Sequence, residues 1–461
     1  MGTLFARAIT TADIYLNGMY DIIMTMTMSS DRDGDGATTP RRIELFKVFT
    51  APSSYQEVSD VLDSGMLTQG SRVERFENEL SDFLEGALYV NTVNSATSGL
   101  QLALEVLKSP HKESGWPGIL PSDKVLAPTL TCWAATCSIL NAGLQPVWID
   151  ANPKTGCAVD LFDIADKLTR ETKVVEIIHW GGTPVDVRSL DKLLDAAAPR
   201  LGFRPLVIED CAHAFGACYP DGRIVGTSGN ICVFSFQAIK VLTCGDGGAI
   251  VFPETAHGAE LYRETRLLRW FGIDRDRRKD PASDGTDYRL EGNITRHGGK
   301  FHMNDYNAAL GLANLPHVPE LVEKARSNCL ELSEGIATLK HVRLLMGKSD
   351  DDNNESSSSL LSYSSCWLFS VWVSDKPAFL KCCAKHGIVT SQVHRRNDTH
   401  SCVECKKLLL PGIDELEQHL MCLPCGWWVS SEDLARIVNV CKLYDNACCC
   451  HDTTITPPER N

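Results

Sequence analysis

The sequence predicts an α/β protein whose main sheet is buried and mostly parallel. Short apolar runs of strand length occupy residues 124–128, 145–150, 173–180, 205–210, 231–236 and 248–252. Several of them are separated by helix-length stretches whose apolar residues recur about every 3.6 positions, such as the stretch that begins at Ser189. This alternation is typical of a parallel sheet that carries helices on both faces. Functional side chains in such proteins gather at the carboxyl ends of the strands.

The length and composition limit the class of protein. A chain of 461 residues can bury a large core and is long enough for two domains. Its net charge of −14 argues against a nucleic-acid partner, because affinity for phosphates comes from clustered lysine and arginine. No apolar stretch reaches the roughly 18–20 residues of a membrane helix, so no membrane partner is expected. The 19 cysteines are scattered and odd in number, which favours a reduced, cytoplasmic protein over a disulfide framework.

Polar segments precede and interrupt the predicted core. Residues 1–42 lack the apolar pattern of a folded domain, and we expect a disordered leader there. The stretch 31–36, DRDGDG, imitates the start of a calcium loop, but Arg42 stands where that loop needs a bidentate glutamate. We therefore expect no calcium site. The tract 348–365 is rich in serine and acidic residues and is predicted to be a polar surface loop.

A lysine follows one of the apolar runs, just before a glycine-rich turn. In the stretch 230–252, NICVFSFQAIKVLTCGDGGAIVF, Lys240 lies between two strand-like runs. A lysine held in a dry, shaped site loses its proton more readily and can attack a carbonyl group. The alternative is a surface lysine beside a hairpin.

Small polar residues begin one of the predicted helices. Residues 95–98, SATS, come directly before apolar residues at helical spacing, namely Leu100, Leu104 and Leu107. A helix start with free amides and hydroxyls is a site for anions. The alternative is an ordinary N-cap, which needs only one serine or threonine.

An acidic pair ends the run 205–210. An unpaired carboxylate is costly at the end of a buried strand, so Asp210 is expected to have a cationic partner. The alternative is that Asp210 caps the helix that follows.

Two cysteine pairs raise the question of a metal site. Cys402 and Cys405 form one C-x-x-C pair, and Cys422 and Cys425 form another, at a spacing typical of zinc ribbons. The segment 413–420 between them has the pattern of a helix and not of a ribbon hairpin, and cysteines are frequent elsewhere. We therefore expect no metal. A zinc-stabilised interaction module is the alternative for this part of the chain.

Together these segments resemble the DegT/DnrJ/EryC1/StrS family of sugar aminotransferases, which use pyridoxal 5′-phosphate (PLP). The matching stretches follow the family's order: LDSGMLTQGSRVERFENELSDFLEG at 62–86, NSATSGL at 94–100, EDCAHAFGA at 209–217 and FSFQAIK at 234–240. The similarity runs over roughly residues 43–445. It implies a fold-type I transferase with a seven-stranded, mostly parallel sheet. The implied parts are a PLP-binding large domain at 43–330, a small C-terminal α+β domain at 331–447 and a tail at 448–461.

The resemblance also implies roles for single residues. Lys240 would bond covalently with the cofactor and carry protons, and Asp210 would pair with the protonated pyridine nitrogen. His213 would contact the phenolic oxygen of the cofactor. The remaining implied contacts are Ser95, Ala96, Thr97 and Ser235 at the phosphate, and Gln237, which replaces a common histidine.

Some positions depart from the family's pattern. An aromatic residue normally stacks on the pyridine ring, and Trp133 is our candidate, although a simple alignment places Cys132 there. Because neighbouring residues face opposite sides, only one of the two can stack. Lys300 replaces an asparagine that reaches the partner's phosphate across a dimer interface, and a lysine can still bind phosphate as a point charge. A polar cluster supplies candidates for substrate recognition: Arg395, Arg396 and Asn397.

The function implied by the resemblance is transamination by a homodimer. The donor would be an amino acid, by resemblance glutamate, and the acceptor would be a keto nucleotide sugar of polysaccharide biosynthesis. The presence of Lys240 argues against the family's dehydration branch, which carries histidine at this position. Two alternatives stay open: a PLP enzyme that acts on another carbonyl substrate, and a PLP-binding regulatory protein without turnover.

Overall fold

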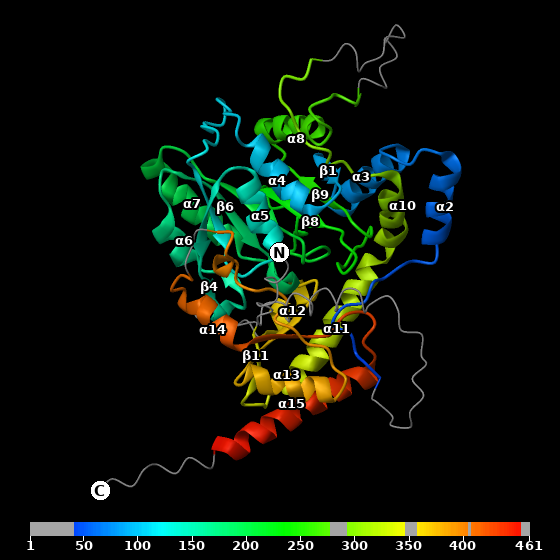
Figure 1. Cartoon of the computed structure of the whole chain (residues 1–461), viewed down its shortest axis with the longest axis vertical. Coiled ribbons are helices and arrows are strands. Elements are labelled where there is room, and N and C mark those ends of the chain that lie inside the picture. Colours follow the sequence, from blue (N-terminus) through cyan, green and yellow to red (C-terminus); the bar gives the residue numbers. More distant parts are fainter. Residues whose placement is uncertain (1–40, 277–292, 346–356, 404–406, 453–461) are drawn as a thin grey trace, which may run out of the picture. The chain divides into compact units, whose positions relative to one another are not determined.

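The main sheet of the protein has seven strands in the order β1-β9-β8-β7-β6-β2-β3 (Figure 1). The computed structural model describes residues 41–276, 293–345, 357–403 and 407–452. Neighbouring strands from β8 to β3 are parallel, whereas β9 runs antiparallel to both β8 and β1. The predicted seven-stranded, mostly parallel sheet is confirmed. The strands are β1 (Val90–Val93), β2 (Lys124–Pro128), β3 (Gln145–Ile149), β6 (Thr172–Ile178), β7 (Leu206–Asp210), β8 (Ile231–Ser235) and β9 (Gly248–Val251).

Helices cover both faces of this sheet, as the strand–helix alternation predicts. One apolar core lies between the sheet and α3, α6, α7 and α10, and a second lies between the sheet and α4, α5 and α8. Close packing of α4 depends on Gly99, where a Cβ atom would come 2.8 Å from the side chain of Val233. The helices are α2 (Ser54–Ser64), α3 (Ser71–Phe83), α4 (Ala96–Val106), α5 (Trp133–Asn141), α6 (Leu161–Lys167), α7 (Val187–Leu201), α8 (Ala256–Leu268) and α10 (Asp305–Asn314).

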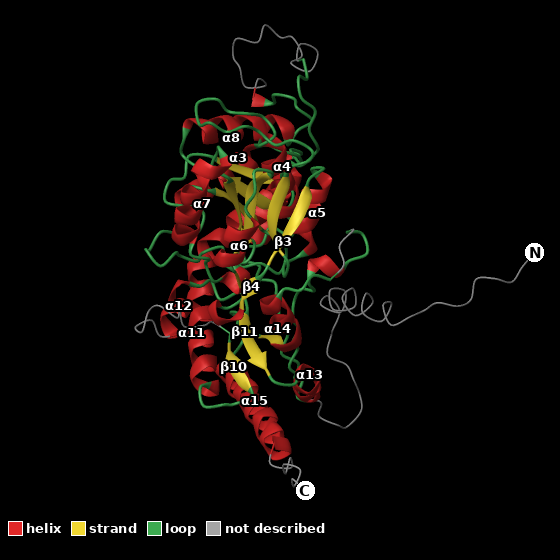
Figure 2. Cartoon of the chain, turned by 90° about the vertical axis from the view of Figure 1, so that its left-hand side faces the viewer, coloured by secondary structure: helices red, strands yellow, loops and turns green. Residues whose placement is uncertain are grey.

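The C-terminal part of the chain builds a smaller antiparallel sheet of β10 (Val342–Leu344), β11 (Phe369–Val373) and β12 (Leu420–Leu423) (Figure 2). A third core joins this sheet to α11, α13 and α15, while α14 packs against a fourth core that contains Trp148 and Trp367. The helices here are α11 (Val318–Ile336), α12 (Ser357–Tyr363), α13 (Lys376–Lys385), α14 (Pro411–His419) and α15 (Ser431–Asp452). A two-stranded ribbon pairs β4 (Ala151–Asn152) with β5 (Ala158–Val159).

Two of the predicted polar segments are shorter than expected. Within the tract 348–365, residues 357–363 form α12, and Ser364 and Ser365 are buried, so the end of this tract belongs to the folded core. The predicted tail at 448–461 begins later than expected, because α15 continues through residues 448–452.

Other sequence predictions concern residues at the margins of the described structure. Residues 1–40, which include the calcium-like stretch 31–36, lie outside the described residues. The described chain is already tied to the fold at Ile43, whose backbone exchanges hydrogen bonds with Gly387 and Val389. Within the described ranges, no helix combines the length and the apolar character needed to cross a membrane.

A carboxyl group lies buried in the central strand β6. Glu176 is 0% exposed, and neither of its oxygens has a hydrogen-bond partner among the described residues. It pairs with Ile208 in β7, so it lies on the same face of the sheet as Asp210, two residues further along. Burial, together with the charge of Asp210, raises the pKa of Glu176 to about 8. The side chain is therefore a neutral acid at pH 7.

This buried acid gives the protein a pH-dependent stability. Between the ordinary pKa of 4.5 and the folded value of about 8, the folded state holds the extra proton of Glu176, so stability falls as the pH rises. Glu176→Gln is expected to remove this pH dependence. By pH 7 the dependence lowers the free energy of unfolding of the wild type by about 3 kcal/mol. Denaturant unfolding of both proteins between pH 5 and 8 measures it, where pH 5 and 8 are roughly the limits of the titration. Equal slopes would show that Glu176 has no raised pKa.

Candidate active site

Lys240 lies in the turn after β8, and its amine is held close to aromatic and acidic groups. Its backbone amide donates to the carbonyl of Gln237 at 2.9 Å, which closes the turn. The Nζ atom lies 3.9 Å from the ring centroid of Trp367. Burial lowers the pKa of the amine to about 8, against the opposing effects of Cys132 and Asp210. At pH 7 about a tenth of this lysine is therefore uncharged and nucleophilic, whereas an ordinary lysine is almost wholly protonated.

Asp210 ends β7 and lies on the side of the sheet that faces Lys240. Its carboxyl is 4% exposed and accepts one hydrogen bond, from the amide of Ala212 at 3.0 Å. Burial raises the pKa of Asp210, and the Ala212 amide and the Lys240 charge counteract that rise. The residues that follow form turns and not a helix, so Asp210 does not cap a helix as the alternative interpretation required. This leaves an acid with room for a cationic partner.

His213 packs into an aromatic group beside the lysine. Its ring stacks on Trp367 with centroids 3.9 Å apart and lies nearly parallel to His394 at 5.7 Å. The Nδ1 atom accepts a hydrogen bond from the amide of Gly181, while Nε2 is buried without a partner among the described residues. Burial and the charge of Lys240 lower the pKa of His213 well below its usual value. The neutral ring therefore presents an Nε2–H group that is free to donate to a ligand.

The predicted phosphate-binding residues converge at the start of α4. Ser95 is the N-cap, and its Oγ accepts from the amide of Ser98 at 3.1 Å. Ser235, at the end of β8, pairs with Gly248, the first residue of β9. A Cβ atom on Gly248 would come 2.8 Å from the amide nitrogen of Ala96, so only glycine allows the strand to approach this helix start. The hydroxyl of Ser235 is thereby brought beside the positive end of α4.

The other predicted cofactor contacts have less distinctive surroundings. Thr97 is half-buried in the first turn of α4, next to Ala96. Gln237 is also half-buried, and its Oε1 accepts from the amide of Ile239 at 3.0 Å. Gln237 therefore shapes the turn that carries Lys240, and its role toward the cofactor stays a prediction.

These residues fit PLP. The cradle at α4 offers amides, hydroxyls and a helix dipole for a phosphate. Asp210 offers a buried carboxylate for the pyridine nitrogen, His213 offers an unsatisfied ring nitrogen for the phenolic oxygen, and Lys240 offers a weakly basic amine for the aldehyde. When bound, the cofactor would also give Asp210 the cationic partner that the sequence predicts for it.

The two candidates for ring stacking occupy different surroundings. Cys132 is exposed, and its thiol is near enough to Lys240 to influence the charge of the amine. Trp133 begins α5 and meets His400 edge-to-face, with centroids 4.8 Å apart. The stacking role of Trp133 stays a prediction, and the position of the Cys132 thiol favours the simple alignment.

Lys300 lies on the surface next to the loop that precedes α4. Its carbonyl accepts from the Nδ2 group of Asn94 at 3.3 Å, and its Nζ atom lies 5.7 Å from the ring centroid of Trp270. The backbone of this residue therefore lies next to Asn94, which directly precedes the N-cap Ser95. Its predicted contact with a partner's phosphate stays a prediction.

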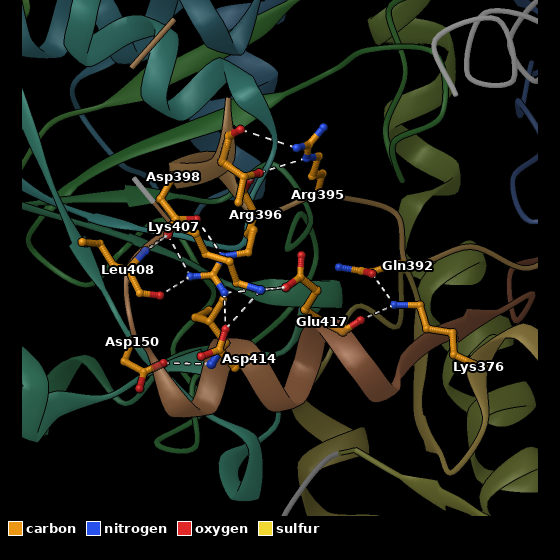
Figure 3. A network of polar contacts seen from close by, with 12 residues as sticks. Asp150, Lys376, Gln392, Arg395, Arg396, Asp398, Lys407, Leu408, Asp414 and Glu417 are labelled. Atoms are coloured by element: carbon orange, nitrogen blue, oxygen red, sulfur yellow. Dashed lines mark hydrogen bonds and ion pairs between the residues drawn. The ribbon is translucent and has the colours of Figure 1, made fainter. Parts of the chain in front are cut away.

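The polar cluster at residues 395–397 is mostly engaged in holding the protein together. Figure 3 shows the Arg396 guanidinium among acidic side chains; it is fully buried and forms a bidentate pair with Asp398, with both distances 2.7 Å. It also contacts Asp414 on α14. Arg396 therefore has a structural role. The prediction that it recognises substrate is wrong, because its guanidinium is buried and paired.

Its neighbours differ from one another. Asn397 donates from Nδ2 to the hydroxyl of Thr136 at 2.9 Å, and so ties this segment to α5. Arg395 is exposed and contacts Thr399, which leaves it as the member of the cluster that stays a candidate for substrate recognition.

A buried network fixes the loop that precedes His213. His179, Glu209 and Cys211 place ligand atoms close enough for a metal ion. The Glu209 carboxylate is already engaged in hydrogen bonds within the protein. It accepts from His179 Nε2 at 2.9 Å, from the Tyr219 hydroxyl and from Asn230 Nδ2. The Nδ1 atom of His179 accepts from the amide of Val185. These hydrogen bonds account for the group without a metal.

The cysteine pairs have unlike surroundings. Cys422 and Cys425 are buried in two separate apolar cores, and Cys402 is exposed, whereas Cys405 lies outside the described residues. The segment between the pairs contains α14, as the helical pattern predicts.

The active site also contains residues that no local sequence pattern indicates. Trp367 contacts both Lys240 and His213. Burial, together with the nearby charge of Lys240, lowers the pKa of His394 to about 3. His394 follows Val393, which adopts a φ of 71°, a conformation that is costly for a β-branched residue. Both lie in the C-terminal part of the chain, and nothing in the local pattern indicates that they return to the main sheet.

One cavity is not lined by the residues that are predicted to hold the cofactor. It has a volume of about 580 Å³ and is lined by Trp180, Gly181 and the start of α7, but not by Lys240 or Asp210. It is therefore not the cofactor site.

Comparison with known proteins gives one consistent family. The model of the DegT/DnrJ/EryC1/StrS aminotransferase family matches residues 50–442. The chain is 33% identical to the spore coat polysaccharide biosynthesis protein SpsC of Bacillus subtilis over 269 residues, which cover 58% of this chain and 62% of that protein.

Comparison with solved structures leads to the same family. The fold is similar to that of AtS13 from Actinomadura melliaura, with a TM-score of 0.77 and 39% identity, covering 89% of this chain and 100% of that one. The sugar aminotransferase CalS13 from Micromonospora echinospora gives a TM-score of 0.75 and 35% identity, covering 87% and 99% of the two chains. The family match spans most of the chain and includes the lysine, the aspartate and the helix start described above. The chain therefore belongs to the DegT/DnrJ/EryC1/StrS aminotransferase family and is a PLP-dependent aminotransferase.

Proposed function

We propose that the protein transfers an amino group from an amino acid, glutamate, to the keto carbon of a nucleotide-linked sugar. The observation that carries the proposal is the convergence of Lys240, Asp210 and the start of α4 at one end of the parallel strands. The similarity to CalS13, which is named as a sugar aminotransferase, and to SpsC, which is named for polysaccharide biosynthesis, supports a sugar acceptor.

Different residues of the chain have different roles in the proposed reaction. Bound PLP supplies an electron sink that allows an amino group and a proton to change carbon atoms. Lys240 acts first as the nucleophile and then, as a free amine, moves the proton between donor and acceptor atoms. Asp210 holds a proton on the pyridine nitrogen by its negative charge. Ser95, Ser235 and the amides of α4 bind the phosphate and fix the position of the ring.

We also propose that the active form is a cytoplasmic homodimer, with Lys300 directed to the partner's phosphate. Large apolar side chains are exposed on α2 and the loop after it, including Tyr55 at 82%, Leu62 at 56% and Met66 at 46%, and a second copy would cover them. The described cysteines are free thiols, which is typical of a reducing compartment. Sedimentation equilibrium measures the oligomeric state, and a monomer with full activity would contradict this arrangement.

A half-reaction screen tests the function. The enzyme is converted to its amine form with glutamate, separated from the donor and mixed with a panel of keto nucleotide sugars. The expected result is that one sugar restores the visible absorbance of the aldehyde form and appears as an amino sugar by mass spectrometry. Restoration only by simple keto acids would indicate another carbonyl substrate. A cofactor band that glutamate does not change would indicate a PLP-binding protein without turnover.

The lowered pKa of Lys240 predicts how fast the empty protein takes up PLP. The neutral amine attacks the aldehyde, so the rate of covalent incorporation should rise with pH and level off above a midpoint of about 8. An ordinary lysine would give a midpoint near its model value of 10.5. Stopped-flow absorbance across this pH range measures the midpoint, with free lysine as the reference amine. A midpoint above 10 would contradict the buried environment described for Lys240.

A further inference from the structure

Trp367 contacts several of the groups that surround Lys240. Its ring centroid lies 3.9 Å from Lys240 Nζ and 3.9 Å from the centroid of His213. Phe46 stacks on it at 4.9 Å, and its Nε1 group donates to the carbonyl of Ile239 at 2.8 Å. The indole is buried, with 7% of the residue exposed. One side chain therefore contacts the lysine, the backbone just before it and the histidine.

Hydrogen bonds tie the backbone on both sides of Trp367 to the loops that follow β6 and β7. The amide of Ser365 donates to the carbonyl of Gly182 at 3.0 Å, and its hydroxyl donates to the carbonyl of His213 at 2.7 Å. The amide of Leu368 donates to the carbonyl of Gly181 at 3.1 Å. These bonds leave the indole little freedom to move away from Lys240.

We propose that Trp367 is a positioning residue, which holds the Lys240 amine and the His213 ring in a fixed relation through its indole face. The proposal rests on the role of Lys240 given under the proposed function. An indole face attracts an ammonium group, so Trp367 favours the protonated amine that Lys240 becomes each time it accepts a proton. The stacked His213 ring is held in the same way at the other contact.

The pKa of Lys240 should depend on its contact with the Trp367 ring. The titratable groups that face the amine are Asp210 from β7, Cys132 before α5, His213 and His394. Burial opposes the ammonium, whereas Cys132 and Asp210 favour it. Removing the indole should therefore lower the pKa of Lys240 further, because one attractive partner of the ammonium is lost.

The experiment compares Trp367→Leu with Trp367→Phe in PLP-free protein. The rate at which an amine reagent labels Lys240 is measured against pH by mass spectrometry of its peptide. We expect the leucine variant to lower the midpoint by about 0.5–1.5 pH units and the phenylalanine variant to restore most of it. Trp372→Phe is the control, because Trp372 lies in the same region but stacks on His419. In PLP-loaded protein, Trp367→Leu should lower kcat with little change in KM for the donor.

Several outcomes overturn the proposal. Unchanged midpoints in both Trp367 variants, with unchanged melting temperatures, would show that the indole only fills space. An equal shift in Trp372→Phe would show a general loss of packing. If Trp367→Leu does not fold, the wild-type indole fluorescence is titrated instead. The fluorescence intensity should change with pH at the same midpoint as the labelling of Lys240, and this change should be absent in Lys240→Met. An identical pH titration in both proteins would contradict the contact.

The labelling result is separate from the proposed function, since it needs neither cofactor nor substrate. If Lys240 is not the residue that bonds with PLP, borohydride reduction and peptide mapping of the loaded enzyme will place the adduct on another lysine. The contact with Trp367 is tested by labelling in either case.

Discussion

Replacing Lys240 with alanine is expected to leave a folded protein that forms no covalent bond with PLP and has lost at least about 10³-fold in turnover. The estimate follows from the two roles of this amine, since general acid–base catalysis alone contributes about 10²–10⁴-fold. Loss of this amine should cost little stability, because among the described residues it forms no ion pair within 4 Å and contacts only the Trp367 ring closely. Borohydride reduction followed by peptide mapping measures the bond, and ketosugar-dependent consumption of glutamate measures turnover.

Lys47 provides a matched control for this experiment. It lines the same small cavity as Lys240 and Trp367, and its amine lies 5.3 Å from the ring centroid of Trp427. Lys47→Ala should keep both the reducible adduct and turnover. A wild-type adduct mapped to Lys47 would transfer the nucleophile role to that residue.

Asp210→Asn is expected to slow the proton-transfer step by at least about 100-fold while PLP still binds. Removing one partner of a buried ion pair costs about 3–5 kcal/mol, because the remaining charge is left without compensation. The pyridine nitrogen would lose its proton, and with it much of the electron sink. Single-turnover kinetics with α-deuterated glutamate isolate the step, since a primary isotope effect should increase in the variant.

A cofactor analogue separates this electrostatic role from a structural one. With a carbon atom in place of the pyridine nitrogen, wild type and Asp210→Asn should react at the same slow rate, because neither can use the ion pair. A variant within threefold of wild type with natural PLP would show that Asp210 serves only to accept the Ala212 amide.

The parts of the protein with regular local patterns could be predicted from the sequence. The strands β6, β7 and β8 are buried along almost their whole length because both faces of the sheet are covered, and their apolar runs make them recognisable. Lys240, Asp210 and Ser235 could be selected because they follow such strands, where parallel sheets place their chemistry. Ser95 could be selected because it is both a helix cap and part of a cluster of small residues.

What escaped prediction depends on contacts between distant segments. Arg396 looked available for substrate in the sequence, but its partner Asp414 comes from a helix that only the fold brings near. Trp367 and His394 reach Lys240 from the C-terminal part of the chain, and aromatic residues next to strands are usually core. Glu176 interrupts an apolar strand with a carboxyl group, and only its lack of partners shows it to be a neutral acid.

The hydrogen bond from Asn397 to Thr136 has a consequence for how the enzyme is made. It joins positions 261 residues apart, and the bonds of Ser365 to His213 span 152 residues. A ribosome therefore completes the whole parallel sheet well before it releases the residues that close the catalytic end. Until then the nascent chain exposes the unfinished edge of its active site, and such long-range closure is slow. Chains truncated before residue 397 should accordingly engage chaperones and fail to retain PLP, even though Lys240 has already been synthesised.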